Sequence, residues 1–147
     1  MKEITYLDKA RNNYRLACDI IKTYIDEGML NLAGYHLQQS VELALKHALM
    51  MNGIDFPKVH DISQLIQILQ ENELSEYVND YIDEHSEMFT MWESKTRYIL
   101  SYSIERRKVE KAIKEVGTYL DLIDQKIQQD QTMSEDEVIS PSHSIKL

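Results

Sequence analysis

The sequence predicts an all-α fold, a helical bundle. Apolar residues recur at intervals of three and four along most of the chain, which is the period of one helix face. The 147 residues include only four glycines and two prolines, too few for the many tight turns of a β-sandwich or barrel. A chain of this length suits one domain with its own core. We therefore expect a helical domain over residues 1–130 and a flexible polar tail over residues 131–147.

The first two helices are predicted from their apolar stripes. The first stripe covers residues 4–25, and Gly28 is expected to end that helix. The second covers residues 30–50 and carries apolar side chains on more than one face, which is typical of a helix packed on several sides. This segment is expected to be the central helix, ending at Asn52–Gly53.

The remaining helices follow a break at Phe56–Pro57, because proline disfavours a helical conformation at the residue before it. Asp61 is a good N-cap for a third helix, with Gln64 in the N3 position of a capping box. A fourth helix is predicted over residues 74–89. A fifth is predicted over about residues 103–127, with Ser103 as a candidate cap.

Charge is distributed unevenly along the chain. The net charge is −9, but residues 71–93 hold eight acids and no base, whereas residues 95–114 hold seven bases and two acids. One interpretation is mutual neutralisation across the solvated faces of neighbouring antiparallel helices. The other is a basic strip that accepts phosphate. The overall acidity argues against bulk, nonspecific binding to nucleic acid.

Composition also disfavours several classes of protein. The single cysteine, Cys18, cannot form an internal disulfide, and no Cys-rich metal framework is present. No window approaches the roughly 18 uninterrupted apolar residues of a membrane span, and the first residues lack the apolar segment of a secretory signal. We expect a cytoplasmic protein that binds no membrane, metal or cofactor.

No standard catalytic motif is found, neither GxxxxGK[ST], GxGxxG, HExxH, a paired CxxC nor GxSxG, and no catalytic residue is predicted. His60 precedes the third helix and could contact an anion or move a proton there. A structural role is favoured, because a neutral imidazole needs only one hydrogen-bond partner. The candidate residues for contact with an anion or nucleotide are Arg97, Tyr98, Arg106, Arg107, His60 and Lys46.

Three segments carry a further pattern. The second helix contributes eight residues, the following turn and helix start four, and the end of the fourth helix three: Ala33, His36, Gln38, Gln39, Glu42, Ala44, Leu45 and Lys46; Gly53, Pro57, His60 and Asp61; and Thr96-Arg97-Tyr98. Together these residues resemble the HEPN family of prokaryotic helical domains, and the resemblance covers roughly residues 4–128. The proline that commonly follows the last element in that family is replaced by Ile99.

The resemblance implies an up-and-down bundle of four to five helices that commonly pairs as a homodimer. Relatives often act beside a minimal nucleotidyltransferase in toxin–antitoxin, defence or stress systems. Many are metal-independent endoribonucleases in which an arginine is followed, after four to six residues, by a histidine that moves protons at the ribose 2′-hydroxyl. No arginine of this sequence is followed by a histidine at that spacing. The sequence therefore predicts a noncatalytic member.

Three functions remain open at this point. The first is a noncatalytic module that forms a homodimer and binds a partner protein such as a minimal nucleotidyltransferase. The second is a nucleotide- or RNA-binding domain, or an endoribonuclease with an atypical site, in which the basic residues contact phosphate and His60 is the acid or base. The third is the substrate-positioning half of a two-chain nucleotidyltransferase whose catalytic carboxylates lie on the other chain.

Overall fold

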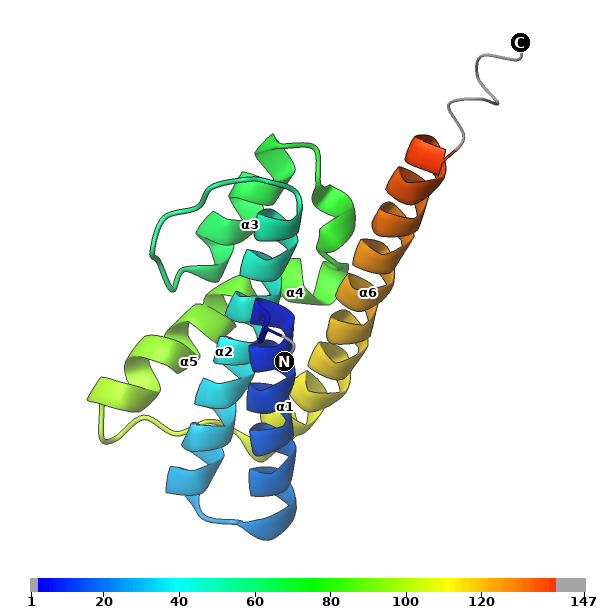
Figure 1. The fold of residues 1–147 in the computed structure, drawn as a ribbon. Helices are drawn as coiled ribbons and strands as arrows, with labels where there is room; N and C mark the ends of the chain where they lie inside the picture. The colour runs from blue at the N-terminus through cyan, green and yellow to red at the C-terminus, as the bar shows by residue number, and fades with distance from the viewer. Residues whose placement is uncertain (1–2, 140–147) are drawn as a thin grey trace.

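Six α-helices and one short 3₁₀ helix make up the part of the chain that the structure describes (Figure 1). The structure is a computed structural model that describes residues 3–139, with the side chains of residues 3–96 and 98–132. No strand occurs within that range, which confirms the all-α fold class. In chain order the elements are α1 (Tyr6–Thr23), α2 (Glu27–Met51), α3 (Ile62–Glu71), η1 (Ser75–Tyr77), α4 (Asp80–Glu84), α5 (Ser86–Tyr98) and α6 (Arg106–Ile139).

The hairpin of α1 and α2 begins the bundle. A capping box opens α1, in which the Thr5 hydroxyl accepts the Asp8 N–H and the Asp8 carboxylate accepts the Thr5 N–H. The Asp26 carboxylate caps α2. Gly28, which was expected to end the first helix, therefore lies in the first turn of the second one.

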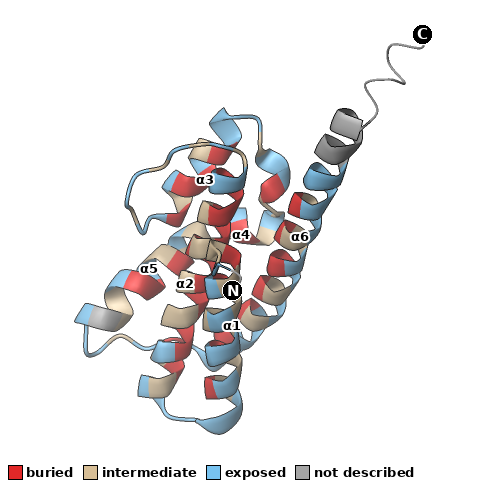
Figure 2. Cartoon of the chain, viewed as in Figure 1, coloured by how far each residue is buried: buried red, intermediate tan, exposed pale blue. Residues whose placement is uncertain are grey.

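The central helix is α2, as predicted, and it is buried on several sides (Figure 2). It packs against α1, α3, α5 and α6, with Leu37, Val41 and Leu45 fully buried. The Ser40 hydroxyl donates a hydrogen bond of 2.8 Å to the Ala10 carbonyl of α1. Because neighbouring helices cover most of its circumference, α2 has no continuous polar stripe.

The predicted fourth helix over residues 74–89 is interrupted, and this part of the prediction was wrong. The Asn79 side chain accepts the Ile82 N–H at 2.9 Å and so begins α4. His85 then separates α4 from α5. An asparagine side chain that binds the backbone ahead of it favours a helix N-terminus over a helix interior. The apolar periodicity survives the breaks, since Ile82 and Phe89 are both fully buried.

The last helix, α6, packs along α1 and α2 and extends past the other helices at its C-terminal end (Figure 1). It begins at Arg106, three residues after the expected cap Ser103, and the Glu105 carbonyl accepts the first helical N–H groups. It continues to Ile139, beyond the domain boundary set at residue 130 from the sequence. Residues 140–147 of the expected tail lie outside the described residues. Within residues 3–139, no helix has the length and hydropathy that a membrane crossing requires.

Candidate functional site

The six candidate residues lie on four parts of the fold. Lys46 is on α2 and His60 is in the loop before α3, whereas Arg97 and Tyr98 end α5. Arg106 and Arg107 begin α6. The side chain of Arg97 lies outside the described ones. The structure joins Lys46 and His60 through a single carboxylate, that of Glu42.

Glu42 is a buried carboxylate with three hydrogen-bond partners. Its side chain is 4% exposed and accepts hydrogen bonds from Lys46 Nζ at 2.9 Å and Gln38 Nε2 at 2.9 Å. His60 Nδ1 lies 2.9 Å from Oε1 of Glu42, the oxygen that also accepts the Gln38 hydrogen bond. Lys46 Nζ also lies 5.9 Å from the centroid of the Phe56 ring. A buried charge is tolerated when it is paired and fully hydrogen-bonded, and this cluster meets that condition.

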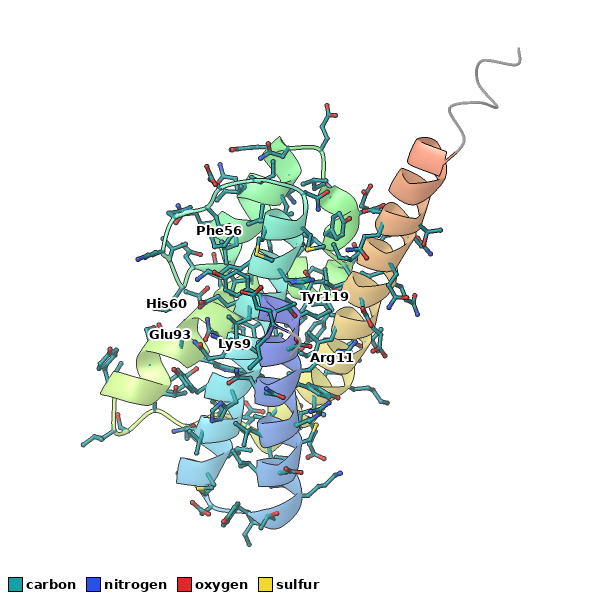
Figure 3. The ribbon with its side chains drawn as sticks, in the orientation of Figure 1. Lys9, Arg11, Phe56, His60, Glu93 and Tyr119 are labelled. Carbon is teal, nitrogen blue, oxygen red and sulfur yellow. The ribbon has the colours of Figure 1, made fainter. Side chains whose placement is uncertain are left out.

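This cluster fastens the loop between α2 and α3 to the central helix. Figure 3 shows Phe56 and His60 on that loop beside α2. The positive charge of Lys46 is cancelled by Glu42, so the Lys46–Glu42 pair attracts phosphate only weakly. The geometry therefore supports the structural role of His60 that the sequence analysis favoured.

The Arg106 side chain binds backbone carbonyls at the C-terminal end of α1. Its guanidinium donates to the Ile21 carbonyl at 2.6 Å and to the Tyr24 carbonyl at 3.2 Å. Carbonyls at a helix C-terminus lack intrahelical partners, and an arginine that binds them stabilises the helix end. Arg106 also lies 3.6 Å from Glu110. Its contacts are those of a structural residue.

Two other bases of the strip, Arg107 and Lys111, pair locally. Arg107 donates to Glu105 at 2.7 Å, and Lys111 lies 3.1 Å from Glu115. These carboxylates belong to α6 or to the residue just before it, and not to the acidic segment 71–93. The pairs thus neutralise charge within one helix, which differs from the cross-helix neutralisation considered from the sequence.

An asparagine that the sequence analysis did not single out holds the α5–α6 loop. The side-chain amide of Asn31, on α2, donates to the Tyr102 carbonyl at 2.6 Å and its oxygen accepts the Ile104 N–H at 3.1 Å. A single asparagine within a helical pattern does not indicate that its side chain will bind the backbone of a distant loop. As a result, residues 99–105 cross the N-terminal half of α2.

The same region exposes several large apolar side chains. Leu100 is fully exposed and Ile99 is 45% exposed, both in the loop after α5, while Leu32 of α2 is 40% exposed. Together with Tyr35 they line a hollow of about 480 Å³. We call Leu32, Tyr35, Ile99 and Leu100 the α2–α5 apolar face. Contiguous exposed apolar surface of this kind commonly marks a site of interaction with another molecule.

Among the described residues, no group of three or more His, Cys, Asp or Glu side chains is arranged to hold a metal ion.

A comparison with family models matches residues 4–126, most of the chain, to the model described as the HEPN domain. The comparisons with curated proteins and with solved structures found no significant match.

Proposed function

The chain belongs to the HEPN domain family, and on that premise we propose that it is a noncatalytic binding module that pairs with a second copy of itself through the α2–α5 apolar face. In the pair it binds a partner protein, for which a minimal nucleotidyltransferase is the leading candidate. The toxin–antitoxin, defence or stress setting of the family is part of this proposal.

The observation that carries the proposal is the exposure of the α2–α5 apolar face. Leu100 is fully exposed and Tyr98 beside it is 70% exposed, an arrangement that leaves apolar surface in water unless another molecule covers it. A two-fold symmetric pair places the same patch of both copies in contact, so a single apolar face is sufficient. The proposal assigns this face to self-association.

The noncatalytic part of the proposal depends on residue spacing and on the contacts of the bases. No arginine is followed by a histidine after four to six residues. Arg106 binds carbonyls of α1, and Lys46 binds Glu42. The alternative of an RNA site built from these candidate residues is supported less well, because a phosphate would have to displace existing partners.

Pairing is tested by measuring the mass of the protein in solution by sedimentation equilibrium. We expect the wild type to be a dimer and Leu100→Asp to dissociate at least tenfold more readily, because a carboxylate would be buried in the apolar interface. Leu16→Asp is the matched control, since Leu16 on α1 is 48% exposed and lies outside the face. It should remain dimeric, and circular dichroism should show both variants to be helical.

A wild type that stays monomeric at high micromolar concentration would contradict the pairing. A dimer that survives Leu100→Asp but dissociates with Leu16→Asp would assign the interface to another surface. Partner binding is tested by co-expression with a neighbouring reading frame that encodes a Gly-Ser followed by a D-x-D pair. Failure of the two chains to copurify would contradict that part of the proposal.

A further inference from the structure

A small hollow lies where the end of α2, the 3₁₀ helix η1 and the distal half of α6 meet, at the end of the molecule from which α6 extends (Figure 1). Its volume is about 290 Å³, at the lower limit of small-molecule sites and suited to a side chain of another protein. The hollow shares no residue with the α2–α5 apolar face. Its lining residues are Met51, Asn52, Tyr77, Ile127, Asp130 and Gln131.

The floor of this hollow is apolar and held in place. The Tyr77 ring is fully buried, its hydroxyl donates a hydrogen bond to the Asp130 carboxylate, and its carbonyl accepts one of 2.7 Å from Tyr119. Ile127 is buried as well, whereas Met51, the last residue of α2, is 39% exposed. A methionine side chain is flexible and adapts to different apolar partners. Met51 therefore suits contact with an apolar side chain of another molecule.

The surface beside the hollow is acidic. Residues 71–84, which run from the end of α3 through η1 into α4, contain six acids and no lysine or arginine, and all six acids are exposed. These acids are Glu71, Glu73, Glu76, Asp80, Asp83 and Glu84. Burial raises the pKa of Tyr77 to about 12, and the charges of Asp130 and Glu76 act in the same direction. Negative charge thus reaches the hollow from both η1 and α6, so this surface attracts cations and repels phosphate.

The apolar floor and the acidic surroundings together select the occupant. Negative charge alone attracts any cation, whereas the apolar floor adds favourable contacts only for an occupant that carries an apolar side chain. At the edge of the hollow, the side-chain amides of Asn52 and Gln131 are able to hydrogen-bond the backbone of an extended peptide. A lysine- or arginine-rich protein segment with an apolar residue uses all three features, whereas a polyamine uses only the charge.

We propose that this hollow docks a basic segment of a partner protein. An apolar side chain of that segment lies against Met51, and its lysine or arginine side chains face Asp130 and the carboxylates of residues 71–84. The inference rests on the proposed function as a partner-binding module, and it names the surface and the chemistry of the partner's segment. It does not depend on self-association, because the α2–α5 apolar face consists of other residues.

The experiment compares three probes on the full chain by isothermal titration calorimetry: a short capped peptide with two leucines among lysines and arginines, the same peptide with serines in place of the leucines, and spermidine. We expect the leucine peptide to bind at least tenfold more tightly than either of the others. Raising the salt concentration from about 0.05 M to about 0.5 M should weaken it at least tenfold, because salt screens exposed charges. The proposal is overturned if the leucine peptide does not bind at millimolar concentration or binds no better than the serine peptide.

Two pairs of variants locate the binding. Met51→Ser should weaken the leucine peptide at least fivefold and leave the serine peptide unchanged. Met50→Ser is the matched control, because Met50 is 44% exposed but lines a different hollow. Glu76→Lys should weaken both peptides at least threefold, whereas Asp19→Lys makes the same change in net charge at an exposed position of α1 and should leave both affinities unchanged. Circular dichroism should show all four variants to be helical.

Failure of this docking surface is distinguishable from failure of the proposed function. Binding of the leucine peptide with these variant effects supports the surface even where the nucleotidyltransferase does not copurify. The surface is overturned, even where copurification succeeds, if Met50→Ser weakens the leucine peptide as much as Met51→Ser or if Asp19→Lys acts like Glu76→Lys. Leu100→Asp should bind the leucine peptide like the wild type, which separates docking from self-association.

Discussion

The carboxylate of Glu42 connects two segments of chain that are separate in the sequence. It holds Gln38 and Lys46 on its own helix and His60 on the loop before α3. Each of these side chains is polar, and the pattern by itself fits either a functional cluster or a structural one. Their shared contact with one buried carboxylate makes them a stabilising unit.

We expect Glu42→Ala to lower the free energy of unfolding by about 3 kcal/mol, because it removes a buried carboxylate and leaves its donors unpaired. Glu71→Ala is the matched control. Glu71 is exposed and accepts one hydrogen bond, from Gln67, so its loss should cost less than about 0.5 kcal/mol. Urea unfolding measures both. Equal losses in the two variants would show that the Glu42 cluster adds no stability.

His47 is a buried histidine with an unsatisfied nitrogen. It is 4% exposed, and its Nδ1 has no hydrogen-bond partner within the described part of the chain. Burial lowers the pKa of His47 below its usual value of 6.5, and the nearby charges of Asp8 and Asp124 oppose this effect. The pKa of His36 is lowered by burial as well. Both imidazoles are therefore neutral in the folded protein at pH 7.

Acid should therefore destabilise the fold through these histidines. Below about pH 6.5 the unfolded chain takes up protons that the folded protein excludes, so stability falls as the pH falls, by at most about 1.4 kcal/mol per pH unit for each histidine. His47→Gln should make the loss between pH 7.5 and 5.5 smaller than in the wild type, as measured by urea unfolding at each pH. Identical pH slopes for the variant and the wild type would rule out this role of His47.

At the scale of helices, the contact of α1 with α6 depends on a close approach at Gly117. The Tyr14 hydroxyl of α1 donates to the Ile113 carbonyl of α6 at 2.9 Å. A Cβ at Gly117 would lie 2.5 Å from that hydroxyl oxygen and 3.0 Å from the ring carbon that bears it. Arg11 adds an ion pair from α1 to Asp121 and Asp124. Figure 3 labels Arg11 and Tyr119, which lie where α1 and α6 face each other.

Gly117→Ala should lower the free energy of unfolding by about 1–2 kcal/mol, because the steric cost of the new methyl group exceeds the gain in helix propensity. In Gly28→Ala the added Cβ would approach only the Asp26 carboxylate, at 3.5 Å, so this control should be neutral or slightly stabilising. Thermal or urea unfolding measures the free energy of unfolding of both variants. Tyr14→Phe should partly rescue Gly117→Ala, because it removes the nearest atom, and a lack of coupling in this cycle would refute the proposed clash.

At the scale of the whole molecule, burial is concentrated around α2 and decreases toward the α5–α6 loop. The middle and C-terminal half of α2 is buried on several sides, whereas residues 98–100 are exposed. Figure 2 shows the same contrast between the centre of the bundle and its ends. Local opening therefore costs most at the centre and least at the surface assigned to pairing.

Amide hydrogen exchange should reflect this gradient. We expect the slowest exchange in α2 and the fastest, at low protein concentration, in the loop after α5. Raising the concentration should slow exchange specifically near Ile99 and Leu100, because pairing covers them, and the Leu100→Asp variant should show no such change. Uniform slowing over the whole chain, or slowing confined to another surface, would contradict the assignment of this face.

Much of the fold could be predicted because helix periodicity is a local property. The all-α class, the central position of α2 and the Asp61 cap are confirmed. The break before α4 was missed because Asn79 is compatible with both a helix interior and an N-cap, and only its contact with the Ile82 N–H decides between them. The extent of α6 was underestimated because its last turns, which carry no apolar stripe, continue as a helix to Ile139.

The candidate site was less predictable because its residues are brought together by tertiary packing. Nothing in the sequence indicates that Lys46 and His60 share Glu42, that Arg106 caps α1, or that Asn31 holds the α5–α6 loop. Apart from the Lys46–Glu42 pair, whose residues are four positions apart on one helix, each contact joins positions far apart in the chain, and the identity of a single residue does not indicate such a partner.

The sequence alone determined the helical class, the family and the absence of the arginine–histidine spacing, because these are properties of residue order. Only the tertiary structure decided which polar residues are buried and paired, and which surfaces remain open. The apolar residues Ile99 and Leu100 are exposed. Tyr81 and His85 line one groove together with Arg107, Lys108 and Lys111, although more than twenty positions separate the two groups. Exposure and juxtaposition depend on how the helices pack, and packing is a property of the whole chain.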